Sequence, residues 1–215
     1  MKDFYTTIAA VAEAEIKEKN SKFIAYACPM TQEKELPERL ADIRKLRPKA
    51  THYCYAYRLG VGENLFRAND DGEPSGTAGR PILGQIDRLG LTNVLVVVVR
   101  YYGGTQLGTS GLLKAYRESA ALALGAATKV EQIVEQKIEI IFTYQQMSDV
   151  MNAVKKLDLH IVEQNFEIGG RLLLAVRQSE VPQTLLKFHA LVEKISEAEA
   201  SGRTEIEGVG VRLIG

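Results

Sequence analysis

The sequence predicts an α+β protein of two domains, and three observations support that prediction. The chain has 215 residues, which suits one large domain or two of roughly 100 residues each. The second half shows strand and helix patterns in the order β-α-β-β-α-β, the split βαβ or ferredoxin-like unit. Charge is uneven, because residues 1–129 hold 18 Lys and Arg against 14 Asp and Glu, whereas residues 130–215 hold 9 against 13. Separate domains are therefore predicted over 1–130 and 135–215.

The first domain is predicted to open with two strands and a helix. Residues 11–17 and 22–30 have strand-like patterns on either side of a Lys-Asn-Ser turn. Residues 33–47 place leucine and isoleucine at helical spacing. Pro37 lies inside this pattern, so the regular part of the helix is expected to start near Pro37 and to stop before Pro48.

Four further elements complete the first domain. Residues 52–59 alternate tyrosines with other side chains and predict a strand with an aromatic face. A short helix is expected near 81–89, after a turn-rich passage. Residues 93–102 are apolar for most of their length, which is typical of a strand buried on both faces. An Ala- and Leu-rich helix is predicted over 112–127.

The second domain follows a linker predicted at 128–135. Gly169-Gly170 is a two-residue hairpin signal between two of its strands. Its six elements have apolar side chains at strand or helix spacing and are predicted, in chain order, at 137–144 (strand), 147–157 (helix), 159–168 (strand), 171–177 (strand), 181–195 (helix) and 204–214 (strand).

Composition excludes several classes of protein. The formal net charge is zero, which argues against a disordered or polybasic chain. The longest apolar run, Val94 to Val99, is far shorter than the roughly 20 residues of a membrane span. Acidic residues at Glu13 and Glu15 argue against a signal peptide. Two cysteines without an export signal predict a cytoplasmic protein with reduced thiols and no membrane partner.

The loop DDGEPSGTAGRP, residues 70–81, is the first candidate for function. Its acidic side chains, Asp70, Asp71 and Glu73, fit two roles. Magnesium sites use one or two carboxylates together with substrate phosphates, and a carboxylate can also act as a general base. Asp-Gly and Glu-Pro are equally ordinary turn formers, so a purely structural role stays open.

The passage RYYGGTQLGTSGLLK, residues 100–114, is the second candidate. A glycine-rich turn lets the backbone approach a partner, and a helix N-terminus directs free N–H groups and positive dipole toward an anion. Arg100 before the turn and Lys114 after it add positive charge. The passage predicts either an anion cradle or merely a tight turn. It matches neither the phosphate-loop pattern nor the dinucleotide fingerprint.

Both candidate loops flank the strand predicted at 93–102, so we expect them to meet and to form one binding surface, with Arg80, Arg100 and Lys114 supplying its positive charge. The alternative is that Asp70 or Asp71 caps the loop while Arg100 is a solvated charge at a strand end. No catalytic residue, metal ligand or cofactor is assigned. The predicted binding residues are Asp70, Asp71, Gly72, Glu73, Gly76, Thr77, Gly79, Arg80, Arg100, Gly103, Gly104, Gly108, Gly111 and Lys114.

Other catalytic sets are missing from the sequence. The three histidines lie in different predicted elements without a nucleophile beside them, and Cys28 and Cys54 have neither the C-x-x-C spacing nor a polar context. Tyr53, Tyr55 and Tyr57 recur with period two, which fits either stacking on nucleic-acid bases or half-buried packing.

Four motifs together resemble the IMPACT family, and most closely its bacterial YigZ/YvyE-type members. They are SKF at 21–23, THYCYAY at 51–57, DDGEPSGTAGRPIL at 70–83 and VVVVRYYGGTQLGTSGLLKAY at 96–116. The resemblance covers about the first 130 residues. It implies an N-terminal domain with the βαβ fold of a ribosomal protein and of elongation factor G domain IV. It implies a C-terminal domain resembling elongation factor G domain V.

The resemblance implies a function in translation. Eukaryotic relatives regulate translation by binding an activator of the amino-acid-control kinase, a pathway that bacteria lack. The favoured hypothesis is a non-enzymatic binding module for RNA, the ribosome or a translation factor, without specific binding of duplex DNA. The alternative, by analogy with kinases of the same fold, is a magnesium-dependent enzyme acting on a nucleotide or another phosphorylated small molecule.

Overall fold

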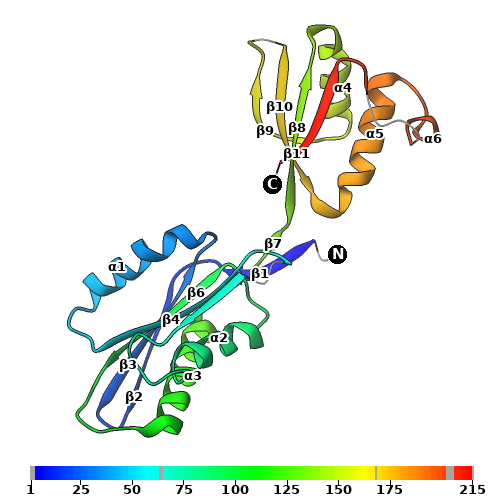
Figure 1. Cartoon of the computed structure of the whole chain (residues 1–215). Helices are drawn as coiled ribbons and strands as arrows, with labels where there is room; N and C mark the ends of the chain where they lie inside the picture. Colours follow the sequence, from blue (N-terminus) through cyan, green and yellow to red (C-terminus); the bar gives the residue numbers. More distant parts are fainter. Residues whose placement is uncertain (1–2, 63–64, 168, 202–205, 215) are drawn as a thin grey trace. The chain divides into compact units, whose positions relative to one another are not determined.

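A five-stranded antiparallel sheet organises the first half of the chain in the computed structural model, which describes residues 3–62, 65–167, 169–201 and 206–214 (Figure 1). The sheet belongs to a compact unit, Tyr5–Gln132, called the N-terminal unit below. Its strands, in spatial order, are β2 (Ala12–Glu18), β3 (Ser21–Pro29), β6 (Val94–Tyr101), β4 (His52–Leu59) and β5 (Leu65–Asn69).

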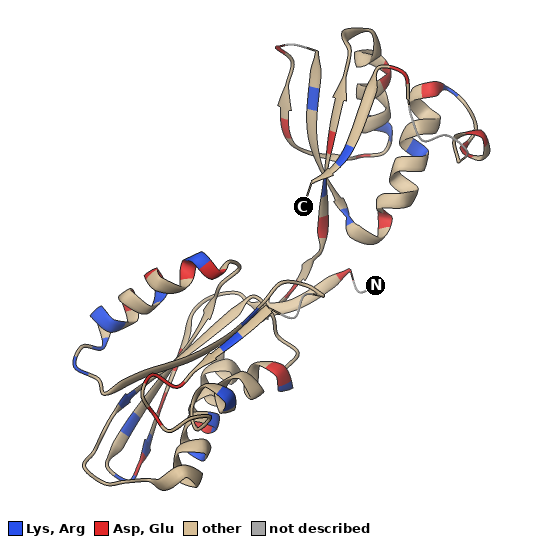
Figure 2. Ribbon diagram, viewed as in Figure 1, with Lys and Arg blue, Asp and Glu red and all other residues tan. Residues whose placement is uncertain are grey.

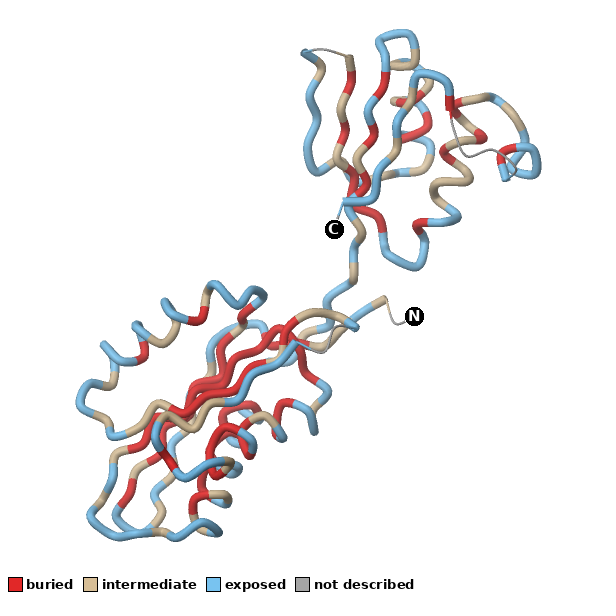
Figure 3. Tube along the Cα trace, viewed as in Figure 1, coloured by how far each residue is buried: buried red, intermediate tan, exposed pale blue. Residues whose placement is uncertain are grey.

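Helices cover both faces of this sheet. Helix α1 (Leu36–Leu46), preceded by a 3-10 turn at Glu33–Glu35, packs on one face; α2 (Gly79–Arg88) and α3 (Gly108–Ala126) pack on the other (Figure 1). Side chains of β6 alternate between the two cores, which explains why Val94–Val99 is apolar throughout and fully buried (Figure 3). The expected strand buried on both faces is confirmed.

Three features of this unit differ from the sequence-based expectations. Strand β5 was not predicted, because four of its five residues are exposed and show no buried alternation. Helix α3 begins at Gly108 rather than near Leu112. Base stacking is wrong for Tyr55 and Tyr57, whose buried rings pack in the core beneath α1.

A small two-stranded sheet, almost all of it in the N-terminal unit, pairs the first and last strands of that unit. Strand β1 (Phe4–Ile8) pairs with β7 (Lys129–Ile133). The predicted linker, 128–135, therefore contains a strand. The second compact unit comprises Ile133–Gly215 together with Met1–Phe4, and is called the C-terminal unit below.

The C-terminal unit is a four-stranded antiparallel sheet in the order β11-β8-β10-β9. Helices α4 and α5 bury Ile138, Leu172 and Phe188 against one face of the sheet. The β-α-β-β-α-β order predicted from the sequence is confirmed, and the chain as a whole is a two-domain α+β protein. The six elements are β8 (Glu135–Phe142), α4 (Met147–Lys156), β9 (His160–Asn165), β10 (Gly170–Arg177), α5 (Val181–Glu193) and β11 (Val209–Ile214).

Minor elements complete this unit. The 3-10 turns Tyr144–Gln146 and Gln178–Glu180 lead into α4 and α5, and a short helix, α6 (Glu197–Ala200), follows α5. The strand predicted at 204–214 is observed from Val209. Residues 204 and 205, and Ile168 at the end of the strand predicted at 159–168, lie outside the described residues. Of the helices that the structure describes, none combines the length and apolar composition needed to span a membrane.

Candidate functional site

The two loops singled out in the sequence meet at one pocket of about 460 Å³ in the N-terminal unit. The 70–80 loop contributes Glu73 and Pro74, and the segment around the start of α3 contributes most of the remainder. The prediction that the loops meet is confirmed. The lining residues are Thr51, His52, Glu73, Pro74, Arg100, Tyr102, Gln106, Leu107, Gly108, Thr109 and Leu112.

Asp70 holds the 70–80 loop closed against the start of α2. Its carboxylate accepts hydrogen bonds from the backbone N–H groups of Gly76, Ala78 and Gly79, at 2.8–3.0 Å. Burial raises the pKa of Asp70, but these three amides and the charge of Arg80 outweigh burial, so the pKa lies below its ordinary value. Asp70 therefore stabilises the loop as a remote helix cap, which is the structural alternative left open by the sequence.

Asp71 joins the loop to strand β4. Its carboxylate accepts a hydrogen bond from the backbone N–H of Tyr53 at 2.7 Å, and its carbonyl oxygen lies 2.7 Å from Nδ1 of His52. Because a carbonyl only accepts, Nδ1 carries the proton in this contact. The other ring nitrogen, Nε2, then faces Glu73 at 3.8 Å.

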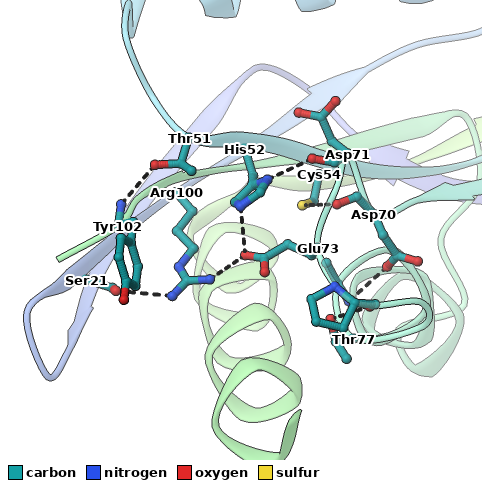
Figure 4. Close-up of polar contacts among 12 residues, drawn as sticks. Ser21, Thr51, His52, Cys54, Asp70, Asp71, Glu73, Thr77, Arg100 and Tyr102 are labelled. Carbon is teal, nitrogen blue, oxygen red and sulfur yellow. Dashed lines mark hydrogen bonds and ion pairs between the residues drawn. The ribbon is translucent and has the colours of Figure 1, made fainter. Parts of the chain in front are cut away.

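Glu73 is the centre of a buried polar network (Figure 4). Its Oε1 atom accepts hydrogen bonds from Arg100 Nη1 at 2.6 Å and from the Tyr116 hydroxyl at 2.7 Å. The Sγ atom of Cys54 lies 3.3 Å from that hydroxyl and donates to the carbonyl oxygen of Asp70 at 3.0 Å. Burial, together with Cys54 and Glu73 beside it, raises the pKa of Tyr116. The network connects the loop to β4, β6 and α3.

Arg100 is a buried cation, not the solvated strand-end charge of the alternative interpretation. Its side chain is 6% exposed and forms an ion pair with Glu73. Nη2 donates to Ser21 Oγ at 3.3 Å, and the guanidinium lies 5.3 Å from the ring centroid of Phe23 and 5.4 Å from that of Tyr102. Nε of Arg100 is buried and has no hydrogen-bond partner among the described residues.

Close backbone approach explains two of the predicted glycines. A Cβ at Gly79 would lie 2.5 Å from the backbone nitrogen of Asn69, and one at Gly103 would lie 1.9 Å from the carbonyl oxygen of Asn20. Neither site has room for a side chain. The remaining predicted loop residues have ordinary structural positions: Gly72, Gly76, Gly104 and Gly108 adopt positive φ, Gly111 lies in the first turn of α3, and Thr77 donates its hydroxyl to the Pro74 carbonyl.

The N-terminus of α3 opens at the pocket. Gly108 and Thr109 line the pocket, and no side chain of the N-cap residue, Leu107, bonds to the first turn. The first N–H groups of a helix have no partner within the helix and carry its positive dipole end. The sequence-based prediction of a glycine-rich turn opening a helix at the site is therefore confirmed.

Two predicted cations do not reach this pocket. Arg80 is exposed on the first turn of α2 and is absent from the lining. Lys114 is also exposed and lines a separate depression with Arg88 and Arg117. Lys114 follows Leu112, which faces the core, by two residues, and a helix turns about 200° over two residues. The prediction that Arg80 and Lys114 supply the charge of the pocket is wrong.

Several residues of the site were not singled out from the sequence. Ser21 is the first residue of β3 and His52 the first residue of β4. The pairing of β4 with β6 places His52 opposite Arg100. This juxtaposition depends on the pairing register, which composition and spacing do not give. Tyr102, 47% exposed, follows Arg100 in the 96–116 motif; its position after the buried strand was the available signal.

Both cysteine thiols are expected to be inert in the native protein. Burial raises the pKa of Cys28 to about 11 and raises that of Cys54 further. Neither thiol should react with iodoacetamide at pH 8, and both should react in 8 M urea. Mass spectrometry of the labelled protein checks this; rapid native labelling of Cys54 would contradict its place in the network.

Known proteins resemble this chain over most of its length. A family model described as the Impact N-terminal domain matches residues 19–124. The IMPACT family member YvyE of Bacillus subtilis is 33% identical over 176 residues, 82% of this chain and 81% of that protein. An IMPACT family member of Haemophilus influenzae is 31% identical over 201 residues, 93% of each chain. A crystal structure of a hypothetical protein superposes with a TM-score of 0.74 at 26% identity, covering 100% of this chain and 99% of that one. The chain belongs to the IMPACT family.

Proposed function

We propose that this chain is a non-catalytic binding protein of the translation machinery, and that its pocket beside α3 recognises an unpaired nucleotide of RNA. Family membership is consistent with a regulatory or binding role. The observation that supports the proposal most strongly is which groups of the pocket remain free. The carboxylates are engaged within the protein, whereas the first residues of α3 line the pocket with no side-chain cap, and the ring of Tyr102, although it contacts the Arg100 guanidinium, is 47% exposed.

These free groups match the two chemical parts of a nucleotide. The N–H groups at the start of α3, with the hydroxyl of Thr109 beside them, can donate to phosphate oxygens. The partly exposed ring of Tyr102 offers a surface on which an unstacked base can lie, as in other proteins that bind single strands. A pocket of about 460 Å³ accommodates a single nucleotide rather than a helix.

Charge within the pocket favours this ligand over duplex DNA. Arg100 is neutralised by Glu73 at 2.6 Å, so the pocket does not present a strong positive field. Binding of duplex DNA relies mainly on multiple phosphate contacts from exposed cations. The family resemblance implies domains like those of a ribosomal protein and an elongation factor, and this analogy between folds supports ribosomal RNA as the source of the nucleotide.

The positions of the acidic side chains favour binding over the alternative, a magnesium-dependent enzyme. Asp70 accepts three backbone amides, Asp71 one, and Glu73 both Arg100 and Tyr116. A carboxylate that held a magnesium ion or acted as a general base would have to exchange these partners. The alternative predicts that a nucleotide with magnesium at 100 times its Kd raises the free energy of unfolding by about 2.7 kcal/mol.

Replacing Tyr102 with alanine is expected to weaken binding to bacterial ribosomes by about 5- to 150-fold, because stacking contributes roughly 1–3 kcal/mol per base. Tyr102→Phe, which keeps the ring, should bind like the wild type. Co-sedimentation at low salt measures the affinity.

Tyr144→Ala is the matched control, since Tyr144 is a similarly exposed tyrosine of the C-terminal unit. Equal affinity of wild type and Tyr102→Ala, or no binding by the wild type above a neutral control protein, would overturn the proposal. Stabilisation by magnesium nucleotides without ribosome binding would favour the enzyme instead.

A further inference from the structure

A second depression of about 570 Å³ lies on α2 and α3 and has a basic lining. It is lined by Gln85 and Arg88 of α2 and by Lys114, Arg117, Glu118 and Ala121 of α3. Figure 2 shows Lys and Arg segments, in blue, on both helices. Three cations and one acid give the lining a formal charge of +2. Arg88, Lys114 and Arg117 are called the basic triad below.

The basic triad has no ion-pair partner in the part of the chain that the structure describes. Asp87 is adjacent to Arg88 in sequence but pairs with Arg58 at 2.7 Å. Some other cations of the same unit are paired, as Arg47 is with Glu13 at 2.6 Å. Glu118, the acid of the same lining, forms no ion pair with these cations among the described residues.

We propose that the basic triad binds consecutive phosphates of an RNA strand. This inference rests on the proposed function and adds to it the surface that holds the RNA backbone. Guanidinium groups bind phosphate oxygens through two parallel N–H donors, and a lysine adds a point charge. The free side chains of the triad are therefore suited to phosphates, which carry no sequence information and fix the position of the strand.

The triad and the pocket would then have different roles in binding. Both draw on the first three turns of α3, since the pocket uses Gly108, Thr109 and Leu112, and the triad uses Lys114 and Arg117 beside Arg88 of α2. The neutralised pocket supplies stacking and directed hydrogen bonds. The triad supplies the electrostatic attraction that the Arg100–Glu73 pair does not. Binding through the charged triad should therefore weaken as the salt concentration rises, whereas stacking in the neutralised pocket should not depend on salt.

The test is the salt dependence of binding to protein-free bacterial ribosomal RNA, measured by filter binding from 0.05 to 0.5 M KCl. For the double variant Lys114→Gln/Arg117→Gln, the slope of log K against log salt should become shallower by about 1.4, at about 0.7 for each phosphate that the variant no longer binds. Extrapolated from 1 M to 0.1 M salt, this change corresponds to roughly 25-fold weaker binding at 0.1 M. Tyr102→Ala should weaken binding at every salt concentration without changing the slope.

The matched control is Lys155→Gln/Lys156→Gln, which removes two exposed charges from α4 of the C-terminal unit. Its slope and affinity should match those of the wild type. If the wild type binds and the triad variant keeps its slope, the triad inference is overturned while the proposed function stands. If the wild type does not bind ribosomal RNA, the proposed function fails and the inference with it. Equal retention of duplex DNA would overturn the assignment of RNA as the partner.

Discussion

Replacing Arg100 with methionine is expected to lower the free energy of unfolding of the N-terminal unit by about 3–5 kcal/mol. The side chains of Arg100 and Glu73 are 6% and 4% exposed, and their ion pair is 2.6 Å long. Removing only the cation leaves a buried carboxylate with the Tyr116 hydroxyl as its remaining close donor. Removing one partner of such a pair costs far more than the pair itself contributes.

Urea unfolding followed by tyrosine fluorescence measures this effect. The chain has nine tyrosines and no tryptophan, and eight of the tyrosines lie in residues 5–132, so the signal reports mainly on this unit. Lys22→Met is the control, because its ion pair with Glu15 is exposed and should contribute less than about 1 kcal/mol. The double variant Arg100→Met/Glu73→Leu should recover much of the loss. A loss no larger than that of the control would show that the network is not a buried ion pair.

Asp70→Ala is the second large effect, with an expected loss of about 2–4 kcal/mol. The substitution leaves the N–H groups of Gly76, Ala78 and Gly79 without their acceptor and removes the cap from α2. Asp42→Ala, at an exposed acid on α1, is the control and should change stability by less than about 0.5 kcal/mol.

The contribution of Asp70 is also expected to depend on pH. The pKa of Asp70 in the folded protein is lower than in the unfolded chain. The folded state therefore binds the proton less readily, and the stabilisation is complete above the unfolded pKa, near 3.9, and is lost as pH falls through the folded value. The difference in stability between wild type and Asp70→Ala should be constant from pH 5 to 7 and should shrink below pH 4. A difference that grows toward low pH would contradict the amide contacts.

The fold could be predicted where local pattern determines it. In the C-terminal unit, helical spacing in 147–157 and 181–195 and the Gly169-Gly170 turn specify the elements without long-range information. Strands β1 and β7 were missed because each has only five residues and is stabilised by a partner about 120 residues away. Their pairing is a long-range contact that periodicity does not report.

The position of the site could be predicted from the sequence, but not which cations line it. The 70–80 loop joins β5 to α2, the other loop joins β6 to α3, and both contribute residues to one pocket, as the sequence predicted. The roles of Arg80 and Lys114 depend on helical phase relative to the sheet, and the first turn of α3 extends four residues earlier than the pattern indicated. Tyr116, which donates to Glu73, looked like an ordinary core residue of an apolar helix.

Ultraviolet cross-linking of the full chain to bacterial ribosomes, followed by mass spectrometry of the cross-linked peptides, tests the central claim most directly. An aromatic ring stacked on a base forms a cross-link of zero length. The proposed recognition of an unpaired nucleotide predicts a ribosomal RNA adduct on Tyr102, which should disappear in Tyr102→Ala while any adduct at the control residue Tyr144 is unchanged. No RNA adduct, or adducts confined to the C-terminal unit, would contradict the proposal.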